Sequence, residues 1–156
     1  MSRFAKIAEK LEAYGLDAML ITSEPNRLYA TEFHSTAGAA VVTKAGSYFF
    51  TDSRYIEAAG KKITGATLGQ NDRENPTSKL VNQVVERHGV KKMGFEEAYM
   101  TVEEHSAWAS KLDCELVPAT ALLMELRTVK DAGEVESLVA AQRIAEKALT
   151  EVLNFI

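Results

Sequence analysis

The sequence predicts an α/β domain in which a mixed sheet of about five or six strands carries helices on both faces. Residues 16–23 form an almost continuously apolar run, which is typical of a strand covered on both faces. Segments with apolar residues at helical spacing alternate with such strands along the chain. At 156 residues, the chain is about the size of one domain and can bury roughly two thirds of its unfolded surface.

The first element is a helix within the first 15 residues, where Phe4, Ile7 and Leu11 share one face. Gly15 followed by Leu16 matches a Schellman-type cap, so the helix should end there and the strand should follow at once. Charges throughout this helix argue against a secretion signal, and no apolar run of 18 residues occurs anywhere.

Two β-rich runs at 39–43 and 47–51 predict an antiparallel hairpin. The runs are separated by a turn in which Gly46 is expected to take a positive φ. After the second strand, we expect a helix that begins with Arg54 and is capped by Asp52 or Ser53.

The next segments continue the alternation of helix and strand. Asn75 as a cap and Pro76 as the first helical residue predict a helix that ends at Gly89. Thr101 and Glu104 have the spacing of a capping box at the start of another helix. Strands are expected near 92–96 and 114–117.

The C-terminal segment predicts a long helix. Asp131 and Glu134 form another possible capping box, and a helical pattern runs from there to Ile156. Such a helix would be roughly 35 Å long, which is more than a compact domain needs. We therefore expect either a chain that was cut here or a helix that leads to an absent part of the protein.

Composition excludes some partners. The 18 Lys and Arg residues are scattered and are outnumbered by 22 Asp and Glu residues, which disfavours nucleic acid and anionic membranes. The single cysteine, Cys114, excludes an intrachain disulfide and lies in a segment typical of a buried strand edge. These features favour a cytoplasmic protein.

Motifs for chemistry are few. His34, His88 and His105 lie far apart and lack zinc-ligand spacing, so the sequence predicts no metal site within this chain. No nucleotide-binding glycine motif or Gly-x-Ser-x-Gly motif occurs. The acids expected at strand ends are too few to indicate a paired-metal nuclease: Asp52, Glu96 and Glu97.

The three histidines differ in their surroundings. His88 lies at a helix C-terminus, where the helix dipole favours it, and His105 lies three residues before Trp108 on a half-buried stripe. His34 lies in a loop of small and hydroxyl residues, which suits either a solvated histidine or a site residue.

Two separated segments resemble one known family. Residues 26–59 resemble the Asn-x-x-Tyr-x-Thr-Gly-Phe and Thr-Asp-x-Arg-Tyr motifs in the N-terminal domain of Xaa-Pro aminopeptidases, prolidases and creatinase. Residues 117–149 resemble the family's Leu-Arg-x-x-Lys-Asp-x-x-Glu-Ile segment, and the order of the two motifs is the same. Glu32 departs from the pattern, because the family usually has glycine there.

The resemblance implies a three-layer creatinase N-terminal fold, distantly ribonuclease-H-like, over residues 1–130. Residues 131–156 would be a linker helix that leads to a C-terminal catalytic domain absent from this sequence. In the family, that domain binds two divalent metal ions, so this chain should hold no metal, no cofactor and no catalytic residue. The resemblance also implies a homodimer in which this domain limits access for short proline-containing peptides.

The strongest candidate for substrate binding is Arg54. A planar guanidinium at the carboxyl end of a strand can hold a peptide carboxylate, and His34 is expected nearby. The alternative is a purely structural ion pair between Arg54 and Asp52. A second hypothesis for the whole chain is a free-standing binding or interaction domain that kept the fold without peptidase activity.

Overall fold

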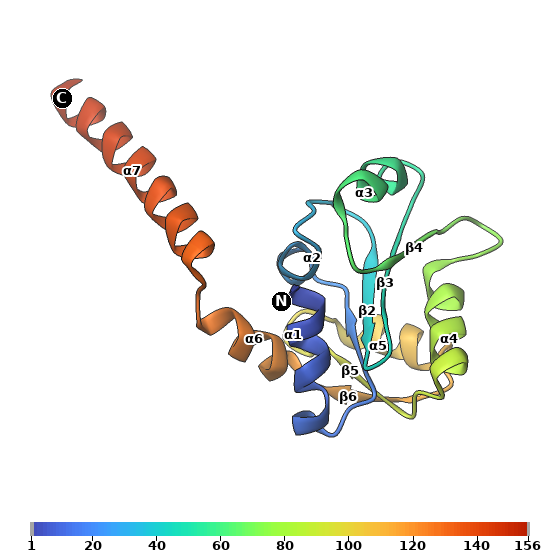
Figure 1. Ribbon diagram of the computed structural model, residues 1–156. Helices are drawn as coiled ribbons and strands as arrows, with labels where there is room; N and C mark the ends of the chain where they lie inside the picture. The colour runs from blue at the N-terminus through green and yellow to red at the C-terminus, as the bar shows by residue number, and fades with distance from the viewer. Residues whose placement is uncertain (1, 156) are drawn as a thin grey trace. The chain divides into compact units, whose positions relative to one another are not determined.

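The computed structural model describes residues 2–155 and divides the chain into two units, Met1–Leu126 and Arg127–Ile156 (Figure 1). The first unit contains a six-stranded mixed sheet in the order β4-β3-β2-β1-β5-β6, which confirms the predicted class. The strands are β1 (Ala18–Ile21), β2 (Ala39–Thr43), β3 (Ser47–Thr51), β4 (Thr67–Gln70), β5 (Lys92–Phe95) and β6 (Glu115–Pro118).

Helices cover both faces of this sheet. The helices of the chain are α1 (Arg3–Lys10), α2 (Glu24–Thr31), α3 (Ile56–Lys62), α4 (Thr77–His88), α5 (Val102–Ala109), α6 (Thr120–Thr128) and α7 (Ala132–Phe155), with a 3₁₀ turn at Glu12–Tyr14. One buried cluster joins the sheet to α1, α2, α3 and α6, and a second joins the opposite face to α4 and α5. The architecture is therefore three-layered, as Figure 1 shows.

The strand β1 lies at the centre of both cores. Met19 and Ile21 contribute to the first cluster, whereas Ala18 and Leu20 contribute to the second. All four side chains are fully buried, which explains why this strand is almost continuously apolar in sequence.

The direction of the strands determines which loops meet. β2 pairs antiparallel with both β1 and β3, while β1 with β5, β3 with β4 and β5 with β6 pair in parallel. Five strands therefore run in one direction, and their carboxyl ends lie at one edge of the sheet. The loop that leads into β2 lies at this same edge, because β2 runs the opposite way.

Several local predictions are confirmed. Gly15 takes a φ of 64°, and the N–H of Leu16 donates to the Leu11 carbonyl at 2.9 Å, as in a Schellman cap. Thr101 and Glu104 form the predicted capping box at α5. Asp131 Oδ1 accepts from the N–H of Glu134 at 3.0 Å, so α7 begins where its sequence indicated.

Three boundary details were wrong. Gly46 does not take a positive φ, because Thr43 Oγ1 closes the turn by accepting from the N–H groups of Ala45 and Gly46. The α3 helix begins at Ile56 rather than Arg54, since residues 53–55 form a separate turn. The α4 helix is preceded by Pro76 as its N-cap in extended conformation, one residue after the predicted cap.

The second unit is dominated by α7, whose 24 residues carry an apolar stripe. Its larger apolar side chains are between 47% and 93% exposed: Val135, Leu138, Val139, Ile144, Leu149, Val152, Leu153 and Phe155. Within residues 2–155, no helix combines the length and the apolar character needed to cross a membrane.

Candidate binding surface at the carboxyl edge of the sheet

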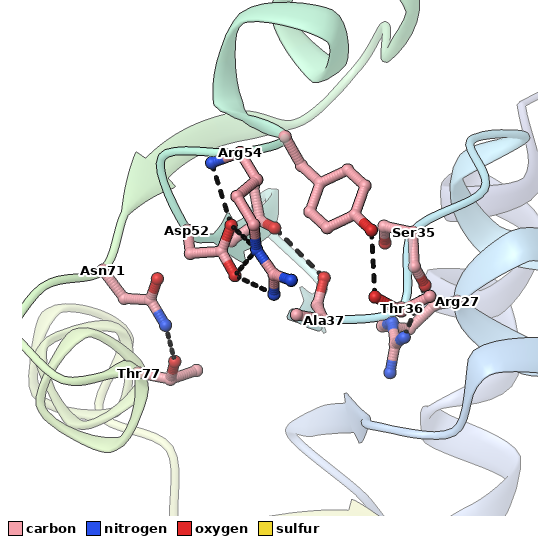
Figure 2. Close-up of polar contacts among 10 residues, drawn as sticks. Arg27, Ser35, Thr36, Ala37, Asp52, Arg54, Asn71 and Thr77 are labelled. Carbon is pink, nitrogen blue, oxygen red and sulfur yellow. Dashed lines mark hydrogen bonds and ion pairs between the residues drawn. The ribbon is translucent and has the colours of Figure 1, made fainter.

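Polar residues follow the strands at the edge where their carboxyl ends meet. Asp52 and Arg54 follow β3, and Asn71 follows β4. Asn71 Nδ2 donates to Thr77 Oγ1 at 2.6 Å, which joins the end of β4 to the start of α4 (Figure 2). The loop at 32–38 reaches the same edge from the other side, and Thr51 Oγ1 donates to the Ala37 carbonyl at 3.0 Å.

Arg54 forms a bidentate ion pair with Asp52, as Figure 2 shows. Arg54 Nη2 lies 2.6 Å from Asp52 Oδ2, and Arg54 Nε lies 3.1 Å from both carboxylate oxygens. These side-chain hydrogen bonds from Arg54 lower the pKa of Asp52, and the Arg54 N–H also donates to Oδ1 at 2.9 Å. The Asp52 carboxylate therefore orders the 53–55 turn, although it does not cap α3 itself.

The ion pair leaves part of the Arg54 guanidinium available. The Arg54 side chain is 65% exposed, and its Nη1 has no hydrogen-bond partner within residues 2–155. The guanidinium also lies 5.3 Å from the centroid of the Tyr55 ring. An exposed fork of this kind can bind a second carboxylate while it stays paired with Asp52.

His34 is exposed on the neighbouring loop and has a different partner. Its Nε2 lies 2.9 Å from Glu24 Oε1, near the start of α2. No hydrogen bond joins His34 to Arg54, and each of these two described residues instead pairs with its own acidic neighbour. Their segments are nevertheless joined, because the hydroxyls of Thr36 and Tyr55 lie 2.9 Å apart. That contact, led by the Thr36 side chain, lowers the pKa of Tyr55.

A buried glutamate, Glu96, lies just after the carboxyl end of β5, beside the end of β1. The chain leaves β1 and β5 toward opposite sides of the sheet, and open α/β sheets bind ligands at such a point. Glu96 is fully buried there. Its carboxylate accepts from Thr22 N at 2.6 Å, Ser23 N at 2.9 Å, Ser23 Oγ at 2.5 Å and Asn26 Nδ2 at 2.6 Å. The protein's own carboxylate therefore occupies the usual ligand position at the N-terminus of α2.

The other candidate acid at this edge also has a structural partner. Glu97 Oε2 accepts from the N–H of Thr120 at 2.8 Å and from its hydroxyl at 2.7 Å, at the start of α6. Burial acts to raise the pKa of Glu97, but the hydrogen bonds from Thr120 outweigh it and lower the pKa. Glu97 and Glu96 thus each bind the N-terminus of a different helix, as carboxylates favour.

The remaining histidines and the cysteine have structural surroundings. His88 Nε2 lies 2.6 Å from Tyr48 Oη, at the C-terminus of α4 as predicted. The His105 ring packs 4.8 Å from the Phe95 ring. Cys114 is partly buried, and burial raises the pKa of its thiol to about 11, so the thiol is protonated near neutral pH.

A shallow groove along α4, closed on its other side by Lys111 after α5, is a weaker candidate. Its lining includes Lys79, Asn82, Glu86 and Lys111. Asn82 Nδ2 donates to Glu86 Oε1 at 3.1 Å and to Asp113 Oδ2 at 2.7 Å. Asn82 and Glu86 therefore bind each other, and Lys79 Nζ donates to the Glu74 carbonyl at 3.1 Å, so most of these polar groups already have partners.

Two buried residues of α2 support this surface from below, and the sequence did not predict that role. Asn26 and Arg27 are 0% and 5% exposed. Asn26 binds Glu96, and Arg27 Nη2 donates to the Ser35 carbonyl at 2.8 Å. Ser23, which accepts from the N–H of Asn26, was the available signal, since serine before Glu-Pro is a common start for a helix.

Comparisons with known proteins identify the family of this fold. Residues 3–129 match the creatinase/prolidase N-terminal domain. The chain is 32% identical over 155 residues to the uncharacterized peptidase YqhT of Bacillus subtilis, covering 99% of this chain and 43% of that protein. It is 28% identical over 151 residues to a putative Xaa-Pro aminopeptidase of Mycoplasma genitalium, covering 96% of this chain and 41% of that protein.

Solved structures agree with this assignment. An Xaa-Pro dipeptidase from Bacillus anthracis superposes with a TM-score of 0.92 at 31% identity, covering 99% of this chain and 43% of that one. The N-terminal domain of the cytoplasmic peptidase PepQ from Mycobacterium tuberculosis gives a TM-score of 0.70 at 29% identity, covering 80% of this chain and 97% of that one. This chain spans less than half the length of the curated relatives it matches. It belongs to the creatinase/prolidase N-terminal domain family.

Proposed function

We propose that the chain works as the N-terminal domain of an Xaa-Pro peptidase, either an aminopeptidase or a dipeptidase. The observation that carries this proposal is the similarity to the Bacillus anthracis Xaa-Pro dipeptidase, which extends over 99% of this chain but only 43% of that protein. The hydrolysis itself would then belong to a C-terminal catalytic domain that follows α7.

The proposed chemistry requires two divalent metal ions in that catalytic domain. A metal pair needs several bridging carboxylates and histidines in one place. Within residues 2–155, no group of three or more His, Cys, Asp or Glu side chains could hold a metal ion. The side chains of residues 2–155 therefore do not fit the metal pair, and no step of the hydrolysis is assigned to them.

The proposed contribution of this domain is to dimerisation and to the access of short proline-containing peptides. His34 and Arg54 would help to bind the carboxylate of the peptide at the active site. Their exposure and the partner-free Nη1 of Arg54 support this role. Because a peptide carboxylate is planar, the guanidinium can bind it with two parallel hydrogen bonds.

A comparison of two proteins tests the proposal. The chain alone, and the chain joined to its C-terminal portion, would be assayed with Xaa-Pro peptides in the presence of manganese. We expect hydrolysis only by the joined protein, and sedimentation analysis should show it as a dimer. Turnover by the chain alone would contradict the proposal. A stop codon directly after Ile156 in the natural gene would favour the free-standing interaction domain instead.

A further inference from the structure

Arg27 is a buried cation whose hydrogen bonds go to main-chain carbonyls. It is 5% exposed and lies on α2. Its Nη1 donates to the Thr22 carbonyl, and its Nη2 donates to the Ser35 carbonyl at 2.8 Å. Burial lowers the pKa of Arg27, and the charges of Glu24 and Glu96 act against this. A buried charge is costly, so its hydrogen bonds must compensate.

The two carbonyls belong to different parts of the chain. Thr22 follows β1 at the centre of the sheet, whereas Ser35 lies in the 32–38 loop between α2 and β2. The guanidinium therefore connects the most buried strand to the loop that carries His34. The guanidinium presents its donors on separate nitrogens, so each carbonyl is bound by its own Nη group, whereas a lysine ammonium offers one nitrogen on a chain of different length.

The beginning of the loop is held by Thr31. Its Oγ1 donates to the Arg27 carbonyl at 2.7 Å and accepts from the N–H of Phe33 at 3.1 Å. The Phe33 ring packs against the Phe49 ring in an edge-on arrangement with the centroids 6.3 Å apart. Phe33 and Ser35 are thus both held, and His34 lies between them.

We propose that Arg27 is a positioning residue that holds the 32–38 loop, so that His34 stays beside Glu24 and Thr36 stays in contact with Tyr55. This inference rests on the proposed role of His34 in peptide binding. Figure 2 shows Arg27 beside Ser35, with Thr36 next in the chain. Two more buried polar atoms, Arg27 Nε and Ser35 Oγ, have no partner within residues 2–155. Nη2 therefore supplies the hydrogen bond from Arg27 to the loop, while Nη1 anchors the same guanidinium to the end of β1. Loss of this link should loosen residues 34–36, although Thr36 and Ala37 keep their contacts with Tyr55 and Thr51.

The structural part is tested with Arg27→Lys and the matched control Arg87→Lys, which changes an exposed arginine of α4. Backbone order parameters for residues 34–36 would be measured by NMR. We expect values of about 0.85 in the parent and in the control, and values below about 0.6 in Arg27→Lys. Unchanged order parameters in Arg27→Lys would show that Arg27 does not hold the loop.

The functional part is tested in the protein joined to its catalytic domain. We expect Arg27→Lys to raise KM for an Xaa-Pro peptide by roughly tenfold with little change in kcat, because the loop affects binding rather than chemistry. His34→Ala is measured in parallel. If His34→Ala raises KM and Arg27→Lys does not, the positioning role is wrong and the role of His34 stands. If neither variant raises KM, both proposals fail.

A measurement on the unaltered protein covers the case in which Arg27→Lys does not fold. Two carbonyl partners should restrict rotation of the Arg27 guanidinium, so its Nη protons should give separate, slowly exchanging NMR signals. The exposed Arg87 guanidinium should give averaged signals and serves as the internal reference. Averaged signals from Arg27 as well would overturn the proposal.

Discussion

Arg54 combines a structural contact with an exposed binding group, and one substitution can separate the two. We predict that Arg54→Ala, in the protein joined to its catalytic domain, lowers kcat/KM for an Xaa-Pro peptide by roughly ten- to a hundredfold. This range corresponds to the loss of one charge-assisted hydrogen bond, which is about 1.5 to 3 kcal/mol. Steady-state kinetics with a series of peptide concentrations would measure it.

The thermal midpoint should change little in the same variant, because the ion pair with Asp52 is exposed to water. Arg87→Ala provides a control for the loss of an exposed arginine. A lower midpoint together with an unchanged kcat/KM of the folded fraction would show that Arg54 only supports the turn, and its role in substrate binding would be wrong.

Glu96 should matter for stability far more than an exposed glutamate does. We predict that Glu96→Gln lowers the free energy of unfolding by about 2 to 4 kcal/mol. The substitution keeps the size of the side chain, but in either orientation the amide NH₂ group would face two donors, either the N–H groups of Thr22 and Ser23 or Ser23 Oγ and Asn26 Nδ2. Urea unfolding at constant m-value would measure the loss.

Glu103→Gln is the matched control for this measurement, because Glu103 is exposed on α5. Its effect should stay within about 0.5 kcal/mol. Equal effects of the two substitutions would mean that the Glu96 carboxylate does not hold the N-terminus of α2.

At the level of single residues, the local sequence was a better guide to near neighbours than to distant ones. The pairing of Asp52 with Arg54 and the capping boxes at Thr101 and Asp131 join residues two or three positions apart, so spacing alone indicates them. The contact of Glu96 with Asn26 joins residues far apart in sequence. No local pattern encodes it, because it depends on the pairing of β1 with β5.

Among the secondary-structure elements, predictions failed where the inward face is polar or the element is short. The sequence pattern predicts no helix at α2, because its buried face includes Asn26 and Arg27 and thus lacks an apolar period. The pattern also predicts no strand at β4, whose four residues include Gly69 and are at most partly buried. No separate helix was predicted at α6, because its residues lie within the 117–149 segment that was interpreted only as a family motif. The strands β1, β2 and β3 were recognised because their side chains are apolar and almost all buried.

The chain enters β2 through Gly38, a position that requires glycine, whereas the hairpin turn at Gly46 does not require it. Gly38 takes a φ of 133°, and a Cβ built there would lie 2.7 Å from the Phe50 carbonyl oxygen. We predict that Gly38→Ala lowers the free energy of unfolding by about 2 to 4 kcal/mol, because it adds backbone strain and a clash with the main chain. Chemical denaturation would measure the effect.

Gly46→Ala is the control within the same hairpin. Gly46 has no positive φ, and the nearest atom to a Cβ there lies 3.8 Å away. Its effect should stay within about 0.5 kcal/mol. A larger loss at Gly46 than at Gly38 would contradict this account of how the hairpin enters the sheet.

On the scale of the whole molecule, the two units should differ in local stability. We predict that amides at 146–155 in α7 exchange at least about a hundredfold faster than those at 18–21 in β1, because α7 contains no buried side chain. Amide hydrogen exchange by mass spectrometry or NMR would show the difference. Residues 81–85 of α4, which include three buried valines, give a helical reference.

Equal protection of α7 and β1 would mean that α7 has a further partner in solution. A second copy of the chain would then be the first to test, by following the exchange as a function of protein concentration. Protection that rises with concentration would identify self-association through the apolar stripe.

The parallel pairing of β1 with β5 also has a consequence for how the chain folds. β1 to β4 form one side of the sheet from a continuous part of the sequence, and β2 and β3 are joined by a tight hairpin. Ala18 pairs with Met93, so β5 can join only after most of the domain has been synthesised. Closing that long loop is entropically costly, which makes the pairing of β1 with β5 the expected slow step. Until then Asn26 and the N-terminus of α2 lack Glu96, so the surface around His34 should be among the last parts of the domain to become ordered.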